Sequence, residues 1–173
     1  PRLYYADLLG LPADHAVIDV ASPFQPGQLR VEIARHISTR YRHRAASLDP
    51  IVALIAREFE ARPGNYLAFF SSYDYLEQVA DRLAARHPQL PSWRQSRRMP
   101  EAERQRFLAR FTDTGQGIGF AVLGGAFSEG IDLPGRRLIG AFLSTLGLPQ
   151  VNPVNEQIRA RMQAMFGAGD DYT

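Results

Sequence analysis

The fold is decided by residues 66–83, which read YLAFFSSYDYLEQVADRL. The apolar run at 66–70 has the length of a buried strand. After it, apolar residues recur at helical spacing and predict a helix with one buried face; they are Tyr75, Leu76, Val79 and Leu83. Asp74 and Glu77 resemble a capping box at the start of this helix. A buried strand that leads directly into an amphipathic helix is typical of an α/β fold.

The same alternation extends in both directions. Further helices are predicted to begin at Asp49-Pro50 and at Pro100-Glu101, and a last one from Asn152-Pro153 to about Phe166. A short helix near the start should end at Gly10. More strands are predicted at 16–20, 29–33, 119–123 and 137–143. We therefore expect one α/β domain over residues 1–173, with a mainly parallel sheet covered by helices on both faces.

The composition of the chain excludes several kinds of functional site. The 173 residues carry a formal net charge of only +2, and all 20 basic residues are arginines. The arginine fork suits phosphates, although an arginine-only chain can equally reflect genomic base composition. Absence of cysteine excludes disulfides and iron–sulfur clusters in this chain, and the four histidines show no metal-ligand spacing. Without a leader-like segment or an apolar run of about 20 residues, we expect a cytoplasmic protein.

Two places where a predicted strand ends are candidate binding sites, because ligands of open α/β sheets gather there. Ser71, Ser72 and Tyr73 offer hydroxyls, an aromatic face and the N–H groups of a helix start, although they can equally form a helix cap. Residues 124–135 read GGAFSEGIDLPG and place Glu129 and Asp132 among glycines that allow close backbone approach. This density of glycine and acid favours a site over a plain loop.

A third candidate is the basic stretch TRYRHR at 39–44. Arg40 and Arg44 flank an aromatic ring, a combination that is found in grooves that follow a nucleic-acid backbone. A run of charges is more often a solvated face, and we prefer that interpretation for the arginines at 94–98.

Motifs for ATP hydrolysis are missing from the sequence. A P-loop requires G-x-x-x-x-G-K-[ST], which a chain without lysine cannot contain. No Asp-Glu dipeptide could supply the metal-binding acid of a Walker B strand. The alternating glycines at 115, 117 and 119 do not complete G-x-G-x-x-G, and they precede a strand. This chain alone is not expected to hydrolyse ATP.

In their order along the chain, these landmarks resemble the DinG/XPD-like superfamily 2 helicases, with the DinG/YoaA type nearest. GAFSEGIDLPG at 125–135 is similar to motif V of that family, and YLAFFSSYDYLEQV at 66–79 is similar to motif IV. Ser22-Pro23-Phe24 and the 39–44 stretch resemble landmarks that follow motif III, and residues 148–153 resemble the segment after motif V. The resemblance covers nearly the whole chain.

The resemblance implies a RecA-like three-layer sandwich that serves as the second motor domain of an ATP-dependent 5′–3′ DNA helicase, with a role in DNA repair. Such helicases clamp ATP and Mg²⁺ between two motor domains and move along single-stranded DNA. Carried over to this sequence, the ATP-cleft residues are Glu129, Gly130 and Asp132, and the residues in contact with DNA are Ser71, Ser72, Tyr73, Arg40 and Arg44. ATP and Mg²⁺ would be held mainly by an N-terminal RecA-like domain of the same polypeptide.

The resemblance also implies that the chain is a fragment, which begins after motif III and ends before motif VI with its arginine finger. Two other classes of protein stay open. One is a non-catalytic α/β module that binds a nucleotide or a protein. The other is half of a two-domain transferase that holds a nucleotide-sugar ribose, although Ser71–Tyr73 would have no obvious role there.

Overall fold

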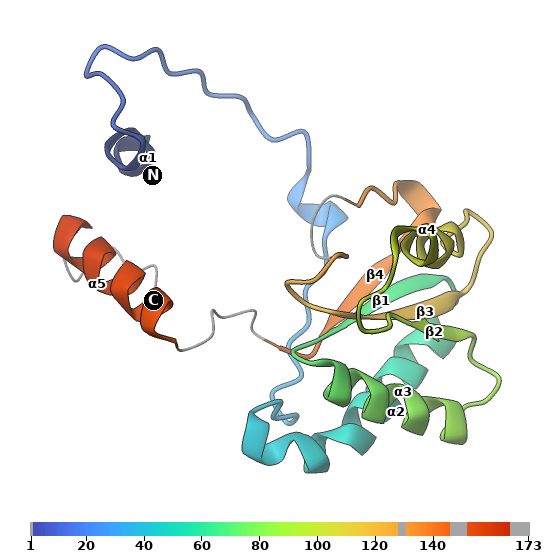
Figure 1. Ribbon diagram of the computed structural model, residues 1–173. Helices are drawn as coiled ribbons and strands as arrows, with labels where there is room; N and C mark the ends of the chain where they lie inside the picture. The colour runs from blue at the N-terminus through green and yellow to red at the C-terminus, as the bar shows by residue number, and fades with distance from the viewer. Residues whose placement is uncertain (1, 128–130, 146–151, 167–173) are drawn as a thin grey trace. The chain divides into compact units, whose positions relative to one another are not determined.

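A computed structural model describes residues 2–127, 131–145 and 152–166 (Figure 1). Within these ranges, four strands form one sheet in the order β2-β3-β1-β4. They are β1 (Asn65–Phe70), β2 (Ser92–Arg94), β3 (Gly117–Val122) and β4 (Gly140–Leu143). All three neighbouring pairs are parallel, which confirms the predicted parallel sheet. The predicted strand at 137–143 is shorter than expected, and β2 was not predicted.

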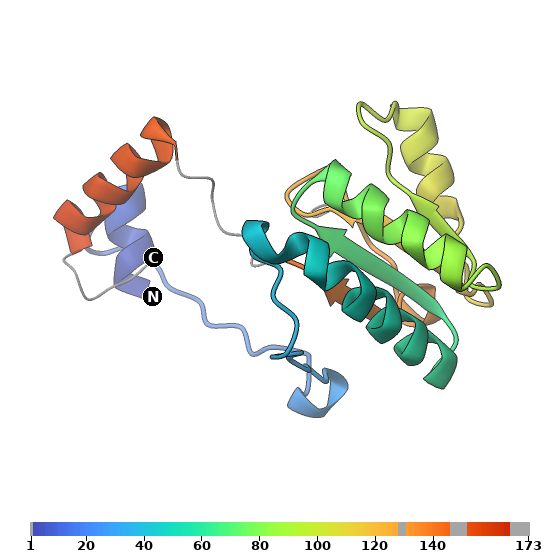
Figure 2. The ribbon, with the colours of Figure 1, turned by 90° about the horizontal axis from the view of Figure 1, so that it is seen from below.

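Helices cover both faces of the sheet. The helices α2 (Arg44–Ala61) and α3 (Tyr73–Arg86) lie side by side on one face, as Figure 2 shows, and α4 (Glu101–Ala109) lies on the other (Figure 1). The three-layer α/β sandwich is therefore confirmed. Because all four strands run the same way, their carboxyl ends meet at one edge of the sheet.

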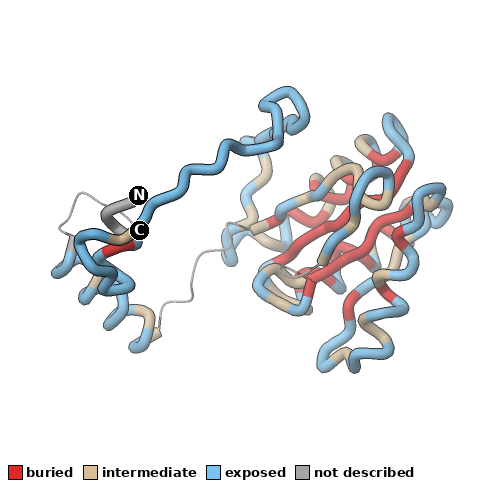
Figure 3. Tube along the Cα trace, turned by 90° about the horizontal axis from the view of Figure 1, so that it is seen from above, coloured by how far each residue is buried: buried red, intermediate tan, exposed pale blue. Residues whose placement is uncertain are grey.

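The sheet lies between two clusters of buried side chains, and Figure 3 shows that buried residues are concentrated in the sheet. One cluster joins the sheet to α2 and α3, and it contains the whole predicted stripe of α3: Tyr75, Leu76, Val79 and Leu83. The other cluster joins the sheet to Phe107 of α4 and to Phe111 just beyond it. The helical periodicity in the sequence therefore identified the buried face of α3 correctly.

The alternating glycines of β3 make room for aromatic rings. A Cβ at Gly117 would lie 2.4 Å from the Trp93 ring, and one at Gly119 would lie 2.7 Å from the ring of Phe111. Alternate positions of a strand point to one face. The glycines thus serve packing between the sheet and α4, not the binding of a dinucleotide.

Two helix starts differ from the predictions. Helix α2 begins at Arg44, directly after the short 3-10 helix η2 (Tyr41–His43), and Pro50 lies inside it instead of in its first turn. Proline there removes one backbone hydrogen bond of the helix, while Ile51, Val52 and Ile55 directly after it are buried in the core. Helix α3 is capped by Ser72, whose Oγ accepts from the Tyr75 N–H at 3.3 Å, and not by Asp74.

The last helix begins as predicted. Helix α5 (Pro153–Phe166) starts with proline, and Asn152 Oδ1 accepts a hydrogen bond of 2.9 Å from the backbone N–H of Asn155. This is the predicted N-cap followed by proline. None of the described helices is long and apolar enough to cross a membrane.

Residues 1–34 form a compact unit separate from residues 35–173. Helix α1 (Arg2–Leu9) ends as predicted at Gly10, whose φ of 62° is left-handed. Beyond it lies only the 3-10 helix η1 (Pro26–Gln28), and the strands predicted at 16–20 and 29–33 are absent from this described segment. Ile18 and Val31, for example, are 85% and 71% exposed. A strand requires a hydrogen-bonded neighbour, and no ladder forms at either run. The expectation of one domain over residues 1–173 stays a prediction.

Candidate functional site

The carboxyl edge of the sheet gathers segments that are distant in the sequence. Ser71 follows β1, Gln95 follows β2 and Leu123 follows β3. Backbone hydrogen bonds continue past the strands at this edge: the N–H groups of Leu123 and Ser144 donate to the carbonyls of Phe70 and Phe69, each at 2.9 Å. The two predicted strand-end junctions therefore start from one continuous, hydrogen-bonded edge.

Arg44 and Ser71 are in direct contact at this edge. Arg44 Nη2 donates a hydrogen bond of 2.6 Å to Ser71 Oγ across 27 residues of sequence. Arg44 is the first residue of α2, and Ser71 is the first residue after β1, so the packing of α2 on the sheet brings them together. Two residues that the sequence assigned to one DNA-binding surface from separate segments are thus neighbours.

Aromatic rings hold the Arg44 side chain in place. Its guanidinium carbon lies 5.2 Å from the ring centre of Tyr41 and 5.1 Å from that of Tyr75, within the range of cation–π attraction. The Tyr75 and Ser47 hydroxyls share a hydrogen bond of 2.5 Å, and burial raises the pKa of the Tyr75 phenol. Because Tyr75 is buried and hydrogen-bonded, the guanidinium rests against a fixed ring.

A shallow hollow of about 390 Å³ opens beside this arginine. Its lining consists of Tyr41, Arg44, Ser72, Asp74, Tyr75 and Gln78. The Arg44 Nε is buried and has no hydrogen-bond partner among the described residues, while Nη2 donates to Ser71. The Asp74 carboxylate in the lining is paired at 2.6 Å with Arg97, which offsets its charge. Arg40 is exposed and precedes η2.

Tyr73 is held by a residue that the sequence did not single out. Its hydroxyl accepts a hydrogen bond of 2.9 Å from Nε2 of Gln95, a side chain with only 4% exposure. The Arg97 guanidinium lies over the Tyr73 ring, 5.1 Å from its centre. Gln95 lay in a stretch that we interpreted as a solvated basic face, and a lone glutamine gives no pattern by which it could have been found.

The glycine-rich loop has the backbone that its sequence predicts. Gly124 and Gly135 adopt left-handed φ values of 79° and 62°, which other residues rarely adopt. Phe127 anchors the loop, since it is 1% exposed and its ring stacks on Phe107 at 4.2 Å. Asp132 is exposed. The other two predicted ATP-cleft residues, Glu129 and Gly130, lie outside the described residues, so that assignment stays a prediction.

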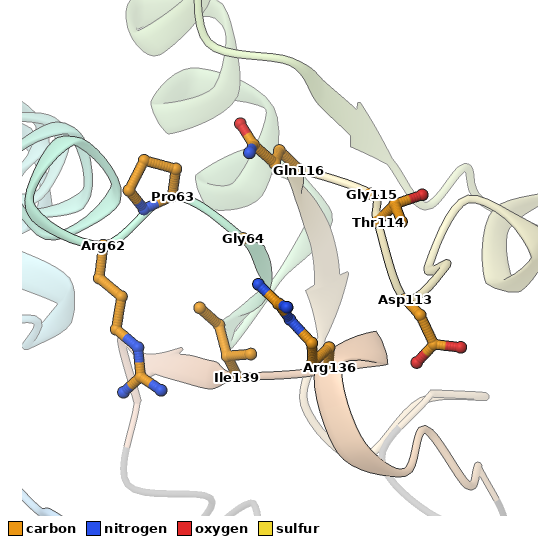
Figure 4. Close-up of a pocket in the computed structure, with 9 residues that line it drawn as sticks. All are labelled: Arg62, Pro63, Gly64, Asp113, Thr114, Gly115, Gln116, Arg136 and Ile139. Atoms are coloured by element: carbon orange, nitrogen blue, oxygen red, sulfur yellow. The ribbon is translucent and has the colours of Figure 1, made fainter.

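A second hollow, of about 480 Å³, lies at the opposite edge of the sheet, where the strands begin (Figure 4). Arg62, Asp113 and Arg136 line it, and it contains none of the predicted site residues. Beneath it, the fully buried Asn65 donates from Nδ2 to the carbonyls of Thr112 and Arg136, at 2.7 and 3.1 Å. Asn65 thereby ties the loops before β3 and β4 together, a structural role.

The parallel sheet with helices on both faces defines an α/β domain, and in domains of this kind ligands bind at the carboxyl edge, where the polar loops gather here. The chain belongs to the family described as the helicase C-terminal domain, whose model matches residues 55–173. That match includes the Ser71–Tyr73 junction and the glycine-rich loop, and it begins beyond Arg40 and Arg44.

Two known proteins support this assignment. The chain is 30% identical over 139 residues to the ATP-dependent DNA helicase CHL1 of Coccidioides immitis (strain RS), covering 70% of this chain and 16% of that protein. The solved structure of S. tokodaii Xpd4 shares the fold, with a TM-score of 0.52 and 19% identity over 76% of this chain and 24% of that one. The predicted DinG/XPD-like helicase C-terminal domain is thus confirmed. The chain spans only a small part of either protein.

Proposed function

We propose that this chain is the second motor domain of an ATP-dependent 5′–3′ DNA helicase, which completes an ATP cleft and contacts single-stranded DNA. The observation that carries the proposal is the hydrogen bond between Arg44 and Ser71 beside the rings of Tyr41 and Tyr75. Sequence-independent grooves for single strands combine cationic groups for phosphates with rings for bases, and this cluster offers both.

The ATP side of the proposal rests on the glycine-rich loop. Its left-handed glycines allow close backbone approach, and Asp132 offers an exposed carboxylate next to them. ATP and Mg²⁺ themselves are assigned mainly to an N-terminal RecA-like domain of the same polypeptide. The name of the relative CHL1 includes both ATP dependence and DNA, which supports a role that involves both ATP and DNA.

The DNA part can be tested by measuring how salt weakens binding. The dissociation constant for a short fluorescent oligothymidylate is measured by anisotropy at several salt concentrations, for the wild-type chain, Arg44→Gln and Arg40→Ala. Each lost phosphate contact should weaken binding and lower the log–log salt slope by about 0.7. Arg57→Gln is the matched control, because Arg57 lies on the same helix and pairs with Glu58 at 2.6 Å.

The salt-dependence measurements distinguish a DNA-binding motor domain from a non-catalytic binding module. If the wild-type chain binds the oligothymidylate and the slope falls for Arg44→Gln but not for Arg57→Gln, the DNA contact is supported. If the slope of Arg44→Gln equals that of wild type, Arg44 is a structural residue. If the wild-type chain shows no affinity for single strands at low salt, a non-catalytic nucleotide- or protein-binding module becomes the better interpretation.

A further inference from the structure

Gln95 occupies the point where the glycine-rich loop and the Ser71–Tyr73 junction meet. It lies just beyond the end of β2, and its backbone N–H donates to the Phe120 carbonyl at 2.8 Å. This bond continues the ladder between β2 and β3, so the Gln95 backbone is fixed. At 4% exposure, a polar side chain is expected to have its amide fully committed.

The hydrogen bonds of Gln95 determine which way its amide points. The Val122 backbone N–H, which can only donate, donates to Gln95 Oε1 at 2.9 Å. The other end of the amide is therefore the NH₂ group, which donates from Nε2 to the Tyr73 hydroxyl oxygen at 2.9 Å. Val122 thus fixes the amide, and the amide in turn makes the Tyr73 oxygen an acceptor.

In this arrangement the Tyr73 hydroxyl does not donate its proton to Gln95. A phenol has one proton and accepts through its lone pairs. Since Nε2 supplies a proton to the oxygen, the phenol's own proton points elsewhere and is available to an acceptor. Tyr73 is half-buried, so its side chain is partly open to solvent. Phosphate and base oxygens of a single strand are acceptors of this kind.

The glycine-rich loop begins directly over Gln95. Val122 is the last residue of β3, and the Gly125 N–H donates back to the Val122 carbonyl at 3.2 Å. A Cβ at Gly125 would lie 3.5 Å from Gln95 Nε2 and 3.1 Å from the Val122 oxygen. The first turn of the loop therefore passes next to the amide that orients Tyr73, and a side chain at Gly125 would contact this amide.

We propose that Gln95 is a positioning residue, fixed by the Val122 N–H, which presents the Tyr73 hydroxyl as a hydrogen-bond donor to an acceptor oxygen on single-stranded DNA. This inference rests on the proposed function. The substitution Gln95→Glu tests it, because a carboxylate of nearly the same shape still accepts from Val122 but now also accepts from Tyr73. The phenol proton then turns inward and is lost to DNA.

The experiment is a double-mutant cycle with oligothymidylate binding by Gln95→Glu, Tyr73→Phe and the double variant. Tyr73→Phe should weaken binding about three- to ten-fold, the effect of losing one hydrogen bond. It should leave the salt slope unchanged, because no charge is lost. Gln95→Glu should weaken binding at least as much in the wild-type chain, but clearly less in the Tyr73→Phe background, where only the effect of the added charge remains.

Equal effects of Gln95→Glu in both backgrounds, or unchanged affinity of Tyr73→Phe, would overturn the role of Gln95. Should Gln95→Glu fail to fold, as judged by its thermal unfolding midpoint, Gln95→Met takes its place in the cycle, because it removes the amide donor to the Tyr73 oxygen. The result for Arg44→Gln keeps the two proposals apart. If Arg44→Gln lowers the salt slope while the cycle is additive, the DNA-binding proposal stands and the inference about Gln95 fails.

Discussion

The guanidinium of Arg44 donates a 2.6 Å hydrogen bond to the hydroxyl of Ser71, which joins the first turn of α2 to the loop after β1. Neither residue indicates a site by itself, since serine at this place also suits a helix cap. Their contact makes one polar surface from two segments. The planar guanidinium also lies against the rings of Tyr41 and Tyr75, so its orientation depends on its shape as well as its charge.

The substitution Arg44→Lys separates these two properties. Lysine retains the positive charge but cannot stack a planar group or reach a phosphate through two donors. We expect single-strand affinity to fall by about 1 kcal/mol, roughly five-fold, while the salt slope stays near the wild-type value. Anisotropy titrations at several salt concentrations measure both quantities. Full affinity in the lysine variant would show that charge alone matters at this position.

Within the complete helicase, Asp132→Ala should abolish unwinding and leave the fold intact. Asp132 is exposed in the glycine-rich loop, and exposed substitutions usually change stability by less than about 0.5 kcal/mol. A strand-displacement assay measures unwinding, and a thermal melt checks the fold. Asp113→Ala, on an exposed loop at the opposite edge of the sheet, is the matched control. Wild-type unwinding by Asp132→Ala would remove this residue from the proposed ATP cleft.

The chain by itself should show no ATPase activity above background. Without lysine it cannot build a P-loop, and we propose that ATP is bound mainly by another domain. A phosphate-release assay on highly purified protein, with and without oligothymidylate, measures this. ATPase activity that elutes together with the chain from a final size-exclusion column would contradict the proposal that hydrolysis requires another domain.

The sequence predicted the elements whose signal is local. The buried stripe from Tyr75 to Leu83 and the N-cap at Asn152 each depend on residues that lie a few positions apart in the sequence. Both predictions are confirmed. The runs at 16–20 and 29–33 show the limit of such reasoning, because an apolar run becomes a strand only when another strand pairs with it. Conversely, β2 has three residues and owes its existence to pairing with β3, which no local pattern records.

In the candidate site, too, the residues with a local sequence signal were predicted, and the contacts that depend on the fold were not. The glycine-rich loop and Ser71–Tyr73 were found because each is a compact motif with typical residue types. The contact between Arg44 and Ser71 depends on how α2 packs, and only the fold could supply it. Gln95 was missed for a similar reason, since its three hydrogen-bond partners lie on β3 and at the start of α3.

Gly119→Val should destabilise the fold through overpacking. A Cβ at this position would lie 2.7 Å from the Phe111 ring and 2.9 Å from the Phe107 ring. Extra carbons in a packed core typically cost about 1–3 kcal/mol. Urea denaturation followed by circular dichroism measures the free energy of unfolding. Gly27→Ala is the control, because no atom lies within 4 Å of a Cβ there; equal stability of the two variants would contradict the packing role of Gly119.

The stabilisation of the fold by the ion pairs between α2 and α3 should depend on pH, because these pairs need the ionised carboxylate of Asp49. Arg82 and Arg86 of α3 bind its carboxylate at 2.7 and 3.0 Å, and the hydrogen bond from Arg82 is the main reason that the pKa of Asp49 is lowered from its ordinary 3.8. A lowered pKa in the folded state means that the pair stabilises the fold above about pH 4 and that this stabilisation is lost as the pH falls through the lowered value.

Asp49→Asn should therefore unfold at a lower temperature than wild type at neutral pH, and the difference should shrink as the pH falls below 3.8. Because the Asp49 side chain is 47% exposed, the difference should also shrink at high salt. Thermal melts from pH 7 down to the lowest pH at which the wild type folds measure the trend, and Arg82→Gln should reproduce it. A difference in melting temperature that is the same at every pH would show that the substitution acts through the helix itself and not through the ion pair.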